Sequence, residues 1–282
     1  MVPTREVGPV AADGPKTSGL ESSRQIDTTV SHSARIWDYW LGGRENYRVD
    51  RELGDRIEEL LPDIVTQARA DRAFLGRVVR FFGEQGIRQF LDIGTGLPTV
   101  DNTHEVAQRV APESRIVYVD NDPLVLVHAR ALLSGTPEGA IDYLDADMHE
   151  PEVIIERASA TLDFDRPIAI TMLGVLWHVL DDAEAQRIID RLMDAVPSGS
   201  HLAVAHPTTE VTGQKMEDAI AQWNRFGSPP GRSRTPAQLA ALFHRLELVE
   251  PGVVSSTRWR PEALPFGEPE EIDRFSVVGR KP

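Results

Sequence analysis

The fold is decided by the stretch Phe90-Leu91-Asp92-Ile93-Gly94-Thr95-Gly96-Leu97-Pro98-Thr99. Apolar residues at its start are typical of a buried strand, and the two glycines that follow predict a tight turn. Because glycine has no Cβ, the backbone there can adopt positive φ and approach a ligand closely. We therefore expect a strand that runs into a nucleotide-binding turn, with a helix beginning shortly after it.

Pro98 stands where a dinucleotide-binding fingerprint would have its third glycine. In that fingerprint the glycines allow a helix N-terminus to approach the cofactor's pyrophosphate. The proline argues against a pyrophosphate-bearing cofactor and leaves other nucleoside ligands open.

Composition narrows the possible partners. The 282 residues are 41% hydrophobic, enough for one large α/β domain or two small ones. The formal charge of −14 argues against nucleic acid or an anionic membrane as the main partner, since phosphate binding needs clustered Lys and Arg. The absence of cysteine fits a cytoplasmic protein. We see no secretory signal and no apolar run long enough to span a bilayer.

The chain divides into a mobile N-terminal arm, residues 1–30, and a single domain, residues 31–282. A helical lid is expected over 31–87, a cofactor-binding core over 88–206, and substrate-side helices with a last strand pair over 207–282. In the lid, a helix rich in aromatic residues should begin near Ser33 and end at Gly42-Gly43.

From residue 88 onward, strands alternate with helices. The predicted strands are Gln89–Ile93, Arg115–Asp120, Ala140–Leu144, Pro167–Leu173 and His201–Ala205. Such alternation implies right-handed parallel crossovers, hence an α/β fold with a doubly wound, mostly parallel sheet.

After the fifth predicted strand, strands and helices no longer alternate. One helix is expected to start at Thr208 or Thr209, and a second near Thr235. Two strand-like runs, Gly252–Trp259 and Arg274–Gly279, should form a loose pair at the end of the chain.

Acidic residues follow the second and third predicted strands. Asp120 and Asn121 close the second, and Asp145 and Asp147 follow the third. Ligands of doubly wound sheets bind beyond the carboxyl ends of the strands, where such an acid can accept hydrogen bonds from ribose hydroxyls or an adenine amine. A turn or helix-cap role is the alternative for each aspartate.

These features resemble the class I S-adenosylmethionine-dependent methyltransferases. The resemblance narrows to an actinobacterial family formerly catalogued as a domain of unknown function, and three segments carry it. They are Arg35-Ile36-Trp37-Asp38-Tyr39-Trp40-Leu41-Gly42-Gly43 with Asn46-Tyr47, then Asp92–Thr99, then Asn102-Thr103-His104-Glu105. The resemblance implies a seven-stranded Rossmann-like sheet whose last strand is antiparallel, preceded by N-terminal helices.

The same resemblance implies S-adenosylmethionine as cofactor and a set of contacts to it. The glycine turn would pass under the methionine part, with Asp92 holding the turn and the ammonium side of the cofactor. Asp120 would bind the ribose, and Asp147 the adenine amine. The full set of implied cofactor residues is Tyr39, Asn46, Asp92, Gly94, Thr95, Gly96, Asp120, Asn121, Asp147 and Met148.

A general base is harder to place. His178 is the candidate because it follows the fourth strand, and a helix-start or core role is the alternative. His206 is a weaker candidate. Three arginines could clamp an anionic substrate or could lie in a solvated loop: Arg225, Arg232 and Arg234. No residue spacing favours a metal site.

The favoured function is methyl transfer to a small-molecule acceptor. Two rival classes remain open: a non-catalytic S-adenosylmethionine sensor, and an NAD(P)-dependent oxidoreductase, against which the missing third glycine counts. The sequence carries no signal for an oligomeric state.

Overall fold

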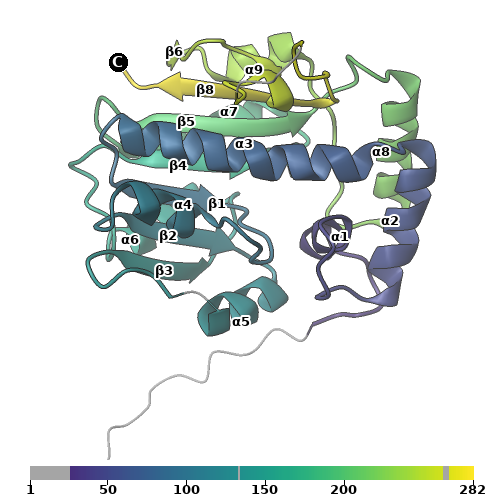
Figure 1. Cartoon of the computed structure of the whole chain (residues 1–282), viewed down its shortest axis with the longest axis horizontal. Helices are drawn as coiled ribbons and strands as arrows, with labels where there is room; N and C mark the ends of the chain where they lie inside the picture. The colour runs from purple at the N-terminus through teal and green to yellow at the C-terminus, as the bar shows by residue number, and fades with distance from the viewer. Residues whose placement is uncertain (1–25, 133, 263–266) are drawn as a thin grey trace, which may run out of the picture.

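A mixed sheet of eight strands forms the centre of the computed structural model, which describes residues 26–132, 134–262 and 267–282 (Figure 1). The strand order is β3-β2-β1-β4-β5-β8-β6, and β7 pairs with β8. The strands are β1 (Gln89–Ile93), β2 (Arg115–Asp120), β3 (Ala140–Asp145), β4 (Ala169–Leu173), β5 (His201–Pro207), β6 (Glu247–Leu248), β7 (Val254–Ser255) and β8 (Arg274–Arg280). Most of the predicted N-terminal arm lies outside the described residues.

Of the described α-helices, three precede β1, four alternate with the first five strands as expected, and two follow β5. They are α1 (Ser33–Trp40), α2 (Arg48–Leu60), α3 (Ile64–Glu84), α4 (Thr103–Val110), α5 (Pro123–Leu132), α6 (Pro151–Ala158), α7 (Asp182–Ala195), α8 (Gln214–Phe226) and α9 (Pro236–Leu242), with short 3₁₀ turns η1 (Leu176–His178) and η2 (Ser256–Arg258). No described helix combines the length and the apolar composition that a membrane crossing requires.

β1 to β5 run parallel, and β8 runs antiparallel to β5. The carboxyl ends of the parallel strands therefore meet at one edge of the sheet, on the right of Figure 1. The prediction of a doubly wound, mostly parallel sheet with a terminal antiparallel strand is confirmed. The sheet has eight strands where seven were predicted, because two-residue strands β6 and β7 both pair with β8.

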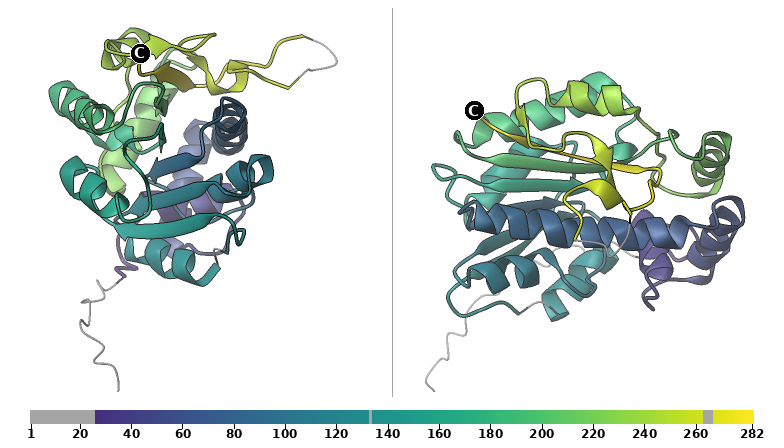
Figure 2. Two further views of the ribbon diagram at one scale, coloured as in Figure 1. Left: turned by 90° about the vertical axis from the view of Figure 1, so that its left-hand side faces the viewer. Right: turned by 45° about the horizontal axis from the view of Figure 1, so that its top comes forward.

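Each face of the sheet is covered by helices (Figure 2). Alternate residues of β1 point to opposite faces: Leu91 and Ile93 join the core beneath α6, α7 and α9, and Phe90 joins the core beneath α3 and α4. Burial on both faces explains why β4 is apolar except for Thr171, while the equally buried β1 carries two polar residues, Gln89 and Asp92.

A third apolar cluster lies beyond the carboxyl ends of the strands. There α1, α2, α8 and the start of α3 pack around Ile36, Trp40, Leu53 and Trp223 (Figure 1). Pro62 separates α2 from α3, because proline cannot continue a helix. This cluster forms one wall of the cavity described below.

Asp50 ties the start of α1 to the start of α2. Its carboxylate is 0% exposed and accepts hydrogen bonds from the backbone N–H groups of His32 (2.9 Å) and Tyr47 (2.8 Å). It also pairs with the buried guanidinium of Arg35 at 3.2 Å. A buried carboxylate that is this fully satisfied fixes how the two helices meet.

In the C-terminal part the predicted strand pair is present, because β7 pairs with β8, but two predicted bounds are wrong. The expected strand Gly252–Trp259 keeps only β7, because Arg77 donates hydrogen bonds to the backbone carbonyls of Ser256 and Trp259 and holds that segment in a turn. The indole of Trp259 packs edge-on against Phe74.

Helix α8 begins at Gln214 instead of at Thr208 or Thr209. The cause is Asp273, which is fully buried and accepts hydrogen bonds from the backbone N–H groups of Val211 and Thr212 at 2.8 Å. These bonds hold the intervening residues in a turn. A long-range partner of this kind leaves no trace in the local sequence.

Asp50→Ala is expected to lower the free energy of unfolding by about 3–5 kcal/mol. It would leave the buried Arg35 guanidinium without its carboxylate partner and two backbone N–H groups without an acceptor. Urea denaturation measures the change. Glu59→Ala, at an exposed position of the same helix, should change it by less than about 0.5 kcal/mol. Equal effects of the two substitutions would show that Asp50 does not organise this corner.

Candidate functional site

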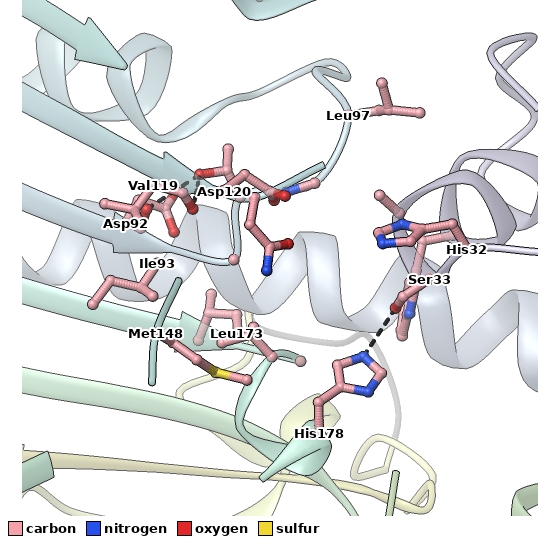
Figure 3. A pocket seen from close by; sticks show the side chains of 18 of the residues that line it. His32, Ser33, Asp92, Ile93, Leu97, Val119, Asp120, Met148, Leu173 and His178 are labelled. Atoms are coloured by element: carbon pink, nitrogen blue, oxygen red, sulfur yellow. Dashed lines mark hydrogen bonds between the residues drawn. The ribbon is translucent and has the colours of Figure 1, made fainter. Parts of the chain in front are cut away.

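A cavity of about 230 Å³ opens at the carboxyl ends of β1, β2 and β4. The sheet edge and the glycine turn form one side, and α1 with η1 forms the other (Figure 3). This is where a doubly wound sheet places its ligand. The predicted residues Asp92, Gly94, Thr95, Gly96, Asp120, Asn121, Asp147, Met148 and His178 all line it.

The glycine turn needs its glycines for two different reasons. Gly94 and Gly96 both have positive φ, at 74° and 66°. A Cβ on Gly94 would lie 2.3 Å from the Cβ of Val175, so this position is sterically closed. A Cβ on Gly96 would meet no atom within 4 Å, so its missing side chain leaves open space beside the cavity.

Asp92 holds the base of the turn. The side chain is 4% exposed, and each of its oxygens accepts a hydroxyl hydrogen bond, from Thr103 at 2.6 Å and from Thr171 at 2.8 Å. Burial raises the pKa of Asp92, while the two threonine bonds oppose that shift. Its role in holding the turn, which the resemblance implies, rests on this geometry.

Asp120 joins the second strand to the turn. Its Oδ2 accepts the Gly96 N–H at 2.8 Å, and its Oδ1 accepts the Asp122 N–H at 2.9 Å. Burial raises the pKa of this carboxyl group, which is 8% exposed. Asp122 caps α5 through the Leu124 N–H and lies 2.8 Å from the imidazole of His32, so it also reaches the start of α1.

The residues after β3 meet those after β2. The amide of Asn121 donates to Asp147 Oδ2 at 3.1 Å, and the His149 N–H donates to Asp147 Oδ1 at 2.9 Å. Met148 lies against the same side of the cavity (Figure 3). The predicted ribose and adenine sites are thus adjacent in space.

Two predicted cofactor residues do not line the cavity: Tyr39 and Asn46. The hydroxyl of Tyr39 donates to Asp55 of α2 at 2.5 Å, on the outer side of α1. The amide of Asn46 donates to Asp38 at 2.8 Å, and it is Asp38 that lines the cavity. In this structure neither side chain reaches the cavity itself, and Asn46 touches it only through Asp38.

Several cavity residues were missed in the sequence. Asp38, whose pKa burial raises, sits among the aromatic residues of α1, and its short polar side chain in that setting was the available signal. Asp71 is 7% exposed and paired with Arg274 of β8 at 2.7 Å, while its Oδ1 has no partner among the described residues. Ser33 and Arg72 also line the cavity. Nothing local in the sequence distinguishes these two from ordinary helix residues.

His178 faces the sheet edge from across the cavity (Figure 3). Its Nδ1 lies 2.9 Å from the carbonyl oxygen of Pro230, and its Nε2 lies 3.2 Å from the hydroxyl of Ser33. Burial lowers the pKa of His178 to about 4, so the imidazole is neutral near pH 7. It is half-buried at the end of η1, where its ring packs against Trp177.

The other candidates lie away from the cavity. His206 is fully buried and accepts from Arg234 at 2.9 Å, and burial holds its pKa well below the ordinary value. Arg234 is 1% exposed and also pairs with Asp182. Arg232 bonds to the Leu180 carbonyl, and Arg225 stacks on a neighbouring ring. The three arginines form neither an anion clamp on this cavity nor a simple solvated loop.

The cavity is strongly acidic. Five carboxylates line it and, among the described residues, only one arginine, Arg72; the carboxylates belong to Asp38, Asp71, Asp92, Asp120 and Asp147. Such a lining favours a cationic ligand. The part of the chain that the structure describes holds no group of three or more His, Asp or Glu side chains that could bind a metal ion.

Two solved structures resemble the chain over most of its length. A DUF574 family protein from Streptomyces avermitilis is 44% identical, with a TM-score of 0.87 over 92% of this chain and 100% of that one. A proposed methyltransferase from Thermobifida fusca is 37% identical, with a TM-score of 0.83 over 90% of this chain and 96% of that one. No curated protein matches the chain.

One family description covers nearly the whole sequence. The model of the S-adenosyl methyltransferase family matches residues 20–282, which include every residue of the cavity. The chain therefore belongs to the S-adenosyl methyltransferase family, and it is an S-adenosylmethionine-dependent methyltransferase.

Proposed function

We propose that the protein transfers the methyl group of S-adenosylmethionine in line to a small-molecule acceptor held in the same cavity. The observation that carries this proposal is the convergence of Asp92, Asp120 and Asp147, from the ends of three neighbouring strands, with the glycine turn on one acidic cavity. A cytoplasmic location stays a prediction from the sequence.

The charge of the cavity fits the cofactor. S-adenosylmethionine supplies a methyl group already activated by a sulfonium cation, and it keeps a net positive charge because its ammonium and carboxylate groups balance. The acidic lining suits this charge, and Asp71 Oδ1, which has no partner among the described residues, leaves an acceptor for a donor such as the ammonium.

The proposed contacts follow from the positions of the strand ends. Asp120 accepts from the ribose hydroxyls, and Asp147 accepts from the adenine amine beside Met148 and Asn121. The turn of Gly94, Thr95 and Gly96 passes along the methionine part, where the open space at Gly96 admits a ligand. Asp92 supports this turn from below.

The acceptor occupies the opposite end of the cavity, between α1 and η1. Because the sulfonium is already a good methyl donor, the protein mainly has to align the acceptor and exclude water. α1 covers this end with Ser33 and Trp37. His178 lies here as the candidate general base.

Methyl transfer is tested with methyl-labelled S-adenosylmethionine and a metabolite extract, with release of S-adenosylhomocysteine as a second readout. Label appearing in an extract component supports the proposal. Tight binding of cofactor without transfer to any acceptor would favour a sensor. Binding of NAD(P) in place of S-adenosylmethionine, measured by calorimetry, would favour an oxidoreductase.

Asp120→Ala is expected to weaken S-adenosylmethionine binding by on the order of 2–4 kcal/mol, which is roughly 30- to 700-fold in Kd. The loss has two sources: the hydrogen bonds to the ribose, and the acceptor that holds the Gly96 N–H in the turn. Isothermal titration measures it. Glu150→Ala, an exposed position just outside the cavity, is the matched control and should leave Kd unchanged. An unaltered Kd for the Asp120 variant would show that the ribose lies elsewhere.

The two glycines of the turn should respond differently to alanine. Gly96→Ala is expected to cost about 1–2 kcal/mol of stability from positive φ alone, while it weakens cofactor binding by filling the open space. Gly94→Ala adds the overlap with Val175 and should cost a further ~1–3 kcal/mol. Thermal unfolding and titration together separate the effects. Equal stabilities of the two variants would contradict the packing argument.

A further inference from the structure

The proton positions on His178 are fixed by its neighbours. The carbonyl oxygen of Pro230, 2.9 Å from Nδ1, can only accept a hydrogen bond, so Nδ1 carries the proton. Nε2 is then unprotonated and accepts from the Ser33 hydroxyl at 3.2 Å. The dashed line in Figure 3 marks this bond across the cavity. The Ser33 oxygen, whose own hydrogen is donated, keeps its lone pairs for a donor on a ligand.

Both partners are held by one short segment. The carbonyl of Ser228 accepts the Ser33 N–H at 3.1 Å, and the carbonyl of Pro230 accepts from His178. Behind η1, the buried Arg234 donates to the carbonyls of Leu176 and Val179, on either side of His178. Ser33 and His178 therefore meet in a fixed geometry, although 145 positions separate them.

The charges near this pair give no counter-charge to an anionic acceptor. The arginines of the 225–234 segment are engaged elsewhere, and Arg274, whose charge acts on His178, is paired with Asp71. Among the described residues at this end the cations are thus already paired, so a carboxylate or phosphate would lack a partner, whereas an uncharged group needs none.

We propose that the methyl acceptor presents an uncharged hydroxyl group to Ser33, and that its proton leaves through Ser33 to His178. This inference rests on the proposed function, whose acceptor it specifies. Ser33 and His178 then form a proton relay at the acceptor end of the cavity.

The step balances in atoms and charge. An oxygen lone pair of the acceptor forms the new O–C bond as the C–S bond breaks, and the electron pair of that bond stays on sulfur. The acceptor's proton passes to the Ser33 oxygen while the Ser33 proton passes to Nε2 of His178. The positive charge of the sulfonium thus becomes the positive charge of an imidazolium, which later returns its proton to water.

The low basicity of His178 is sufficient for a hydroxyl acceptor but not for an alkylammonium acceptor. An imidazole whose pKa is lowered to about 4 is far too weak a base to deprotonate an alkylammonium before attack. A hydroxyl oxygen becomes strongly acidic as it gains the methyl group, so even a weak base takes its proton at that moment.

The experiment identifies the atom that receives the label. The full chain is incubated with ¹³C-methyl S-adenosylmethionine and a metabolite extract, and the labelled product is examined by ¹³C–¹H NMR and by treatment with mild alkali. An alkali-stable O-methyl ether is expected. A methyl ester, an N-methyl or a C-methyl product would overturn the hydroxyl assignment and leave methyl transfer itself intact. No labelled product at all would overturn the proposed function and this inference with it.

Variants test the relay on that same acceptor. Ser33→Ala is expected to lower kcat on the order of 100-fold, with S-adenosylhomocysteine affinity and Tm unchanged. Ser33→Thr, which restores a hydroxyl, should recover most of the rate. His178→Asn keeps a donor toward Pro230 but loses Nε2, so it should match Ser33→Ala, and the double variant should be no slower than either.

Ser31→Ala is the matched control, because Ser31 bonds to the Phe226 carbonyl on the same segment but does not line the cavity. It should keep the parent rate. Full activity of Ser33→Ala would overturn the relay. An equal loss in Ser31→Ala would also overturn it, since the effect would then come from loosening of α1.

Discussion

Asp92 places a carboxyl group in the interior of the sheet, where an unsatisfied charge would be strongly destabilising. Two hydroxyls prevent this: Thr171 from the neighbouring strand β4 and Thr103 from the first turn of α4. The three side chains together fix where β1 ends and where α4 begins. Because the glycine turn spans that interval, its shape and the position of every strand-end ligand group depend on this buried arrangement.

The cavity that results has two unlike ends. At the sheet edge, acidic groups such as Asp120, at the end of β2, and Asp147, just after β3, line the cavity. At the far end, Ser33 and His178 come from a helix start and a 3₁₀ turn, held by a loop. The first end uses features common to doubly wound sheets, whereas the second is built from α1, η1 and the loop after α8, which lie outside the sheet.

The sequence sufficed where local chemistry decides the structure. Strand β1 and the end of α1 before Gly42 follow from an apolar run and from glycine, and both were predicted closely. Contacts between distant segments could not be predicted. Helix α8 starts later than predicted because Asp273, more than 60 positions away, bonds to the residues before it. Tyr39 points toward α2 because its hydroxyl bonds to Asp55 of that helix.

Two consecutive residues at the start of α1 touch both ends of the cavity. His32, the residue before the helix, lies against Asp122, and Ser33, its first residue, lies against His178. In the proposed function the cofactor and the acceptor would each depend on where this helix start lies, and thermodynamic linkage makes such a coupling equal in both directions. The first turn of α1 is then the element through which binding at one end would affect binding at the other.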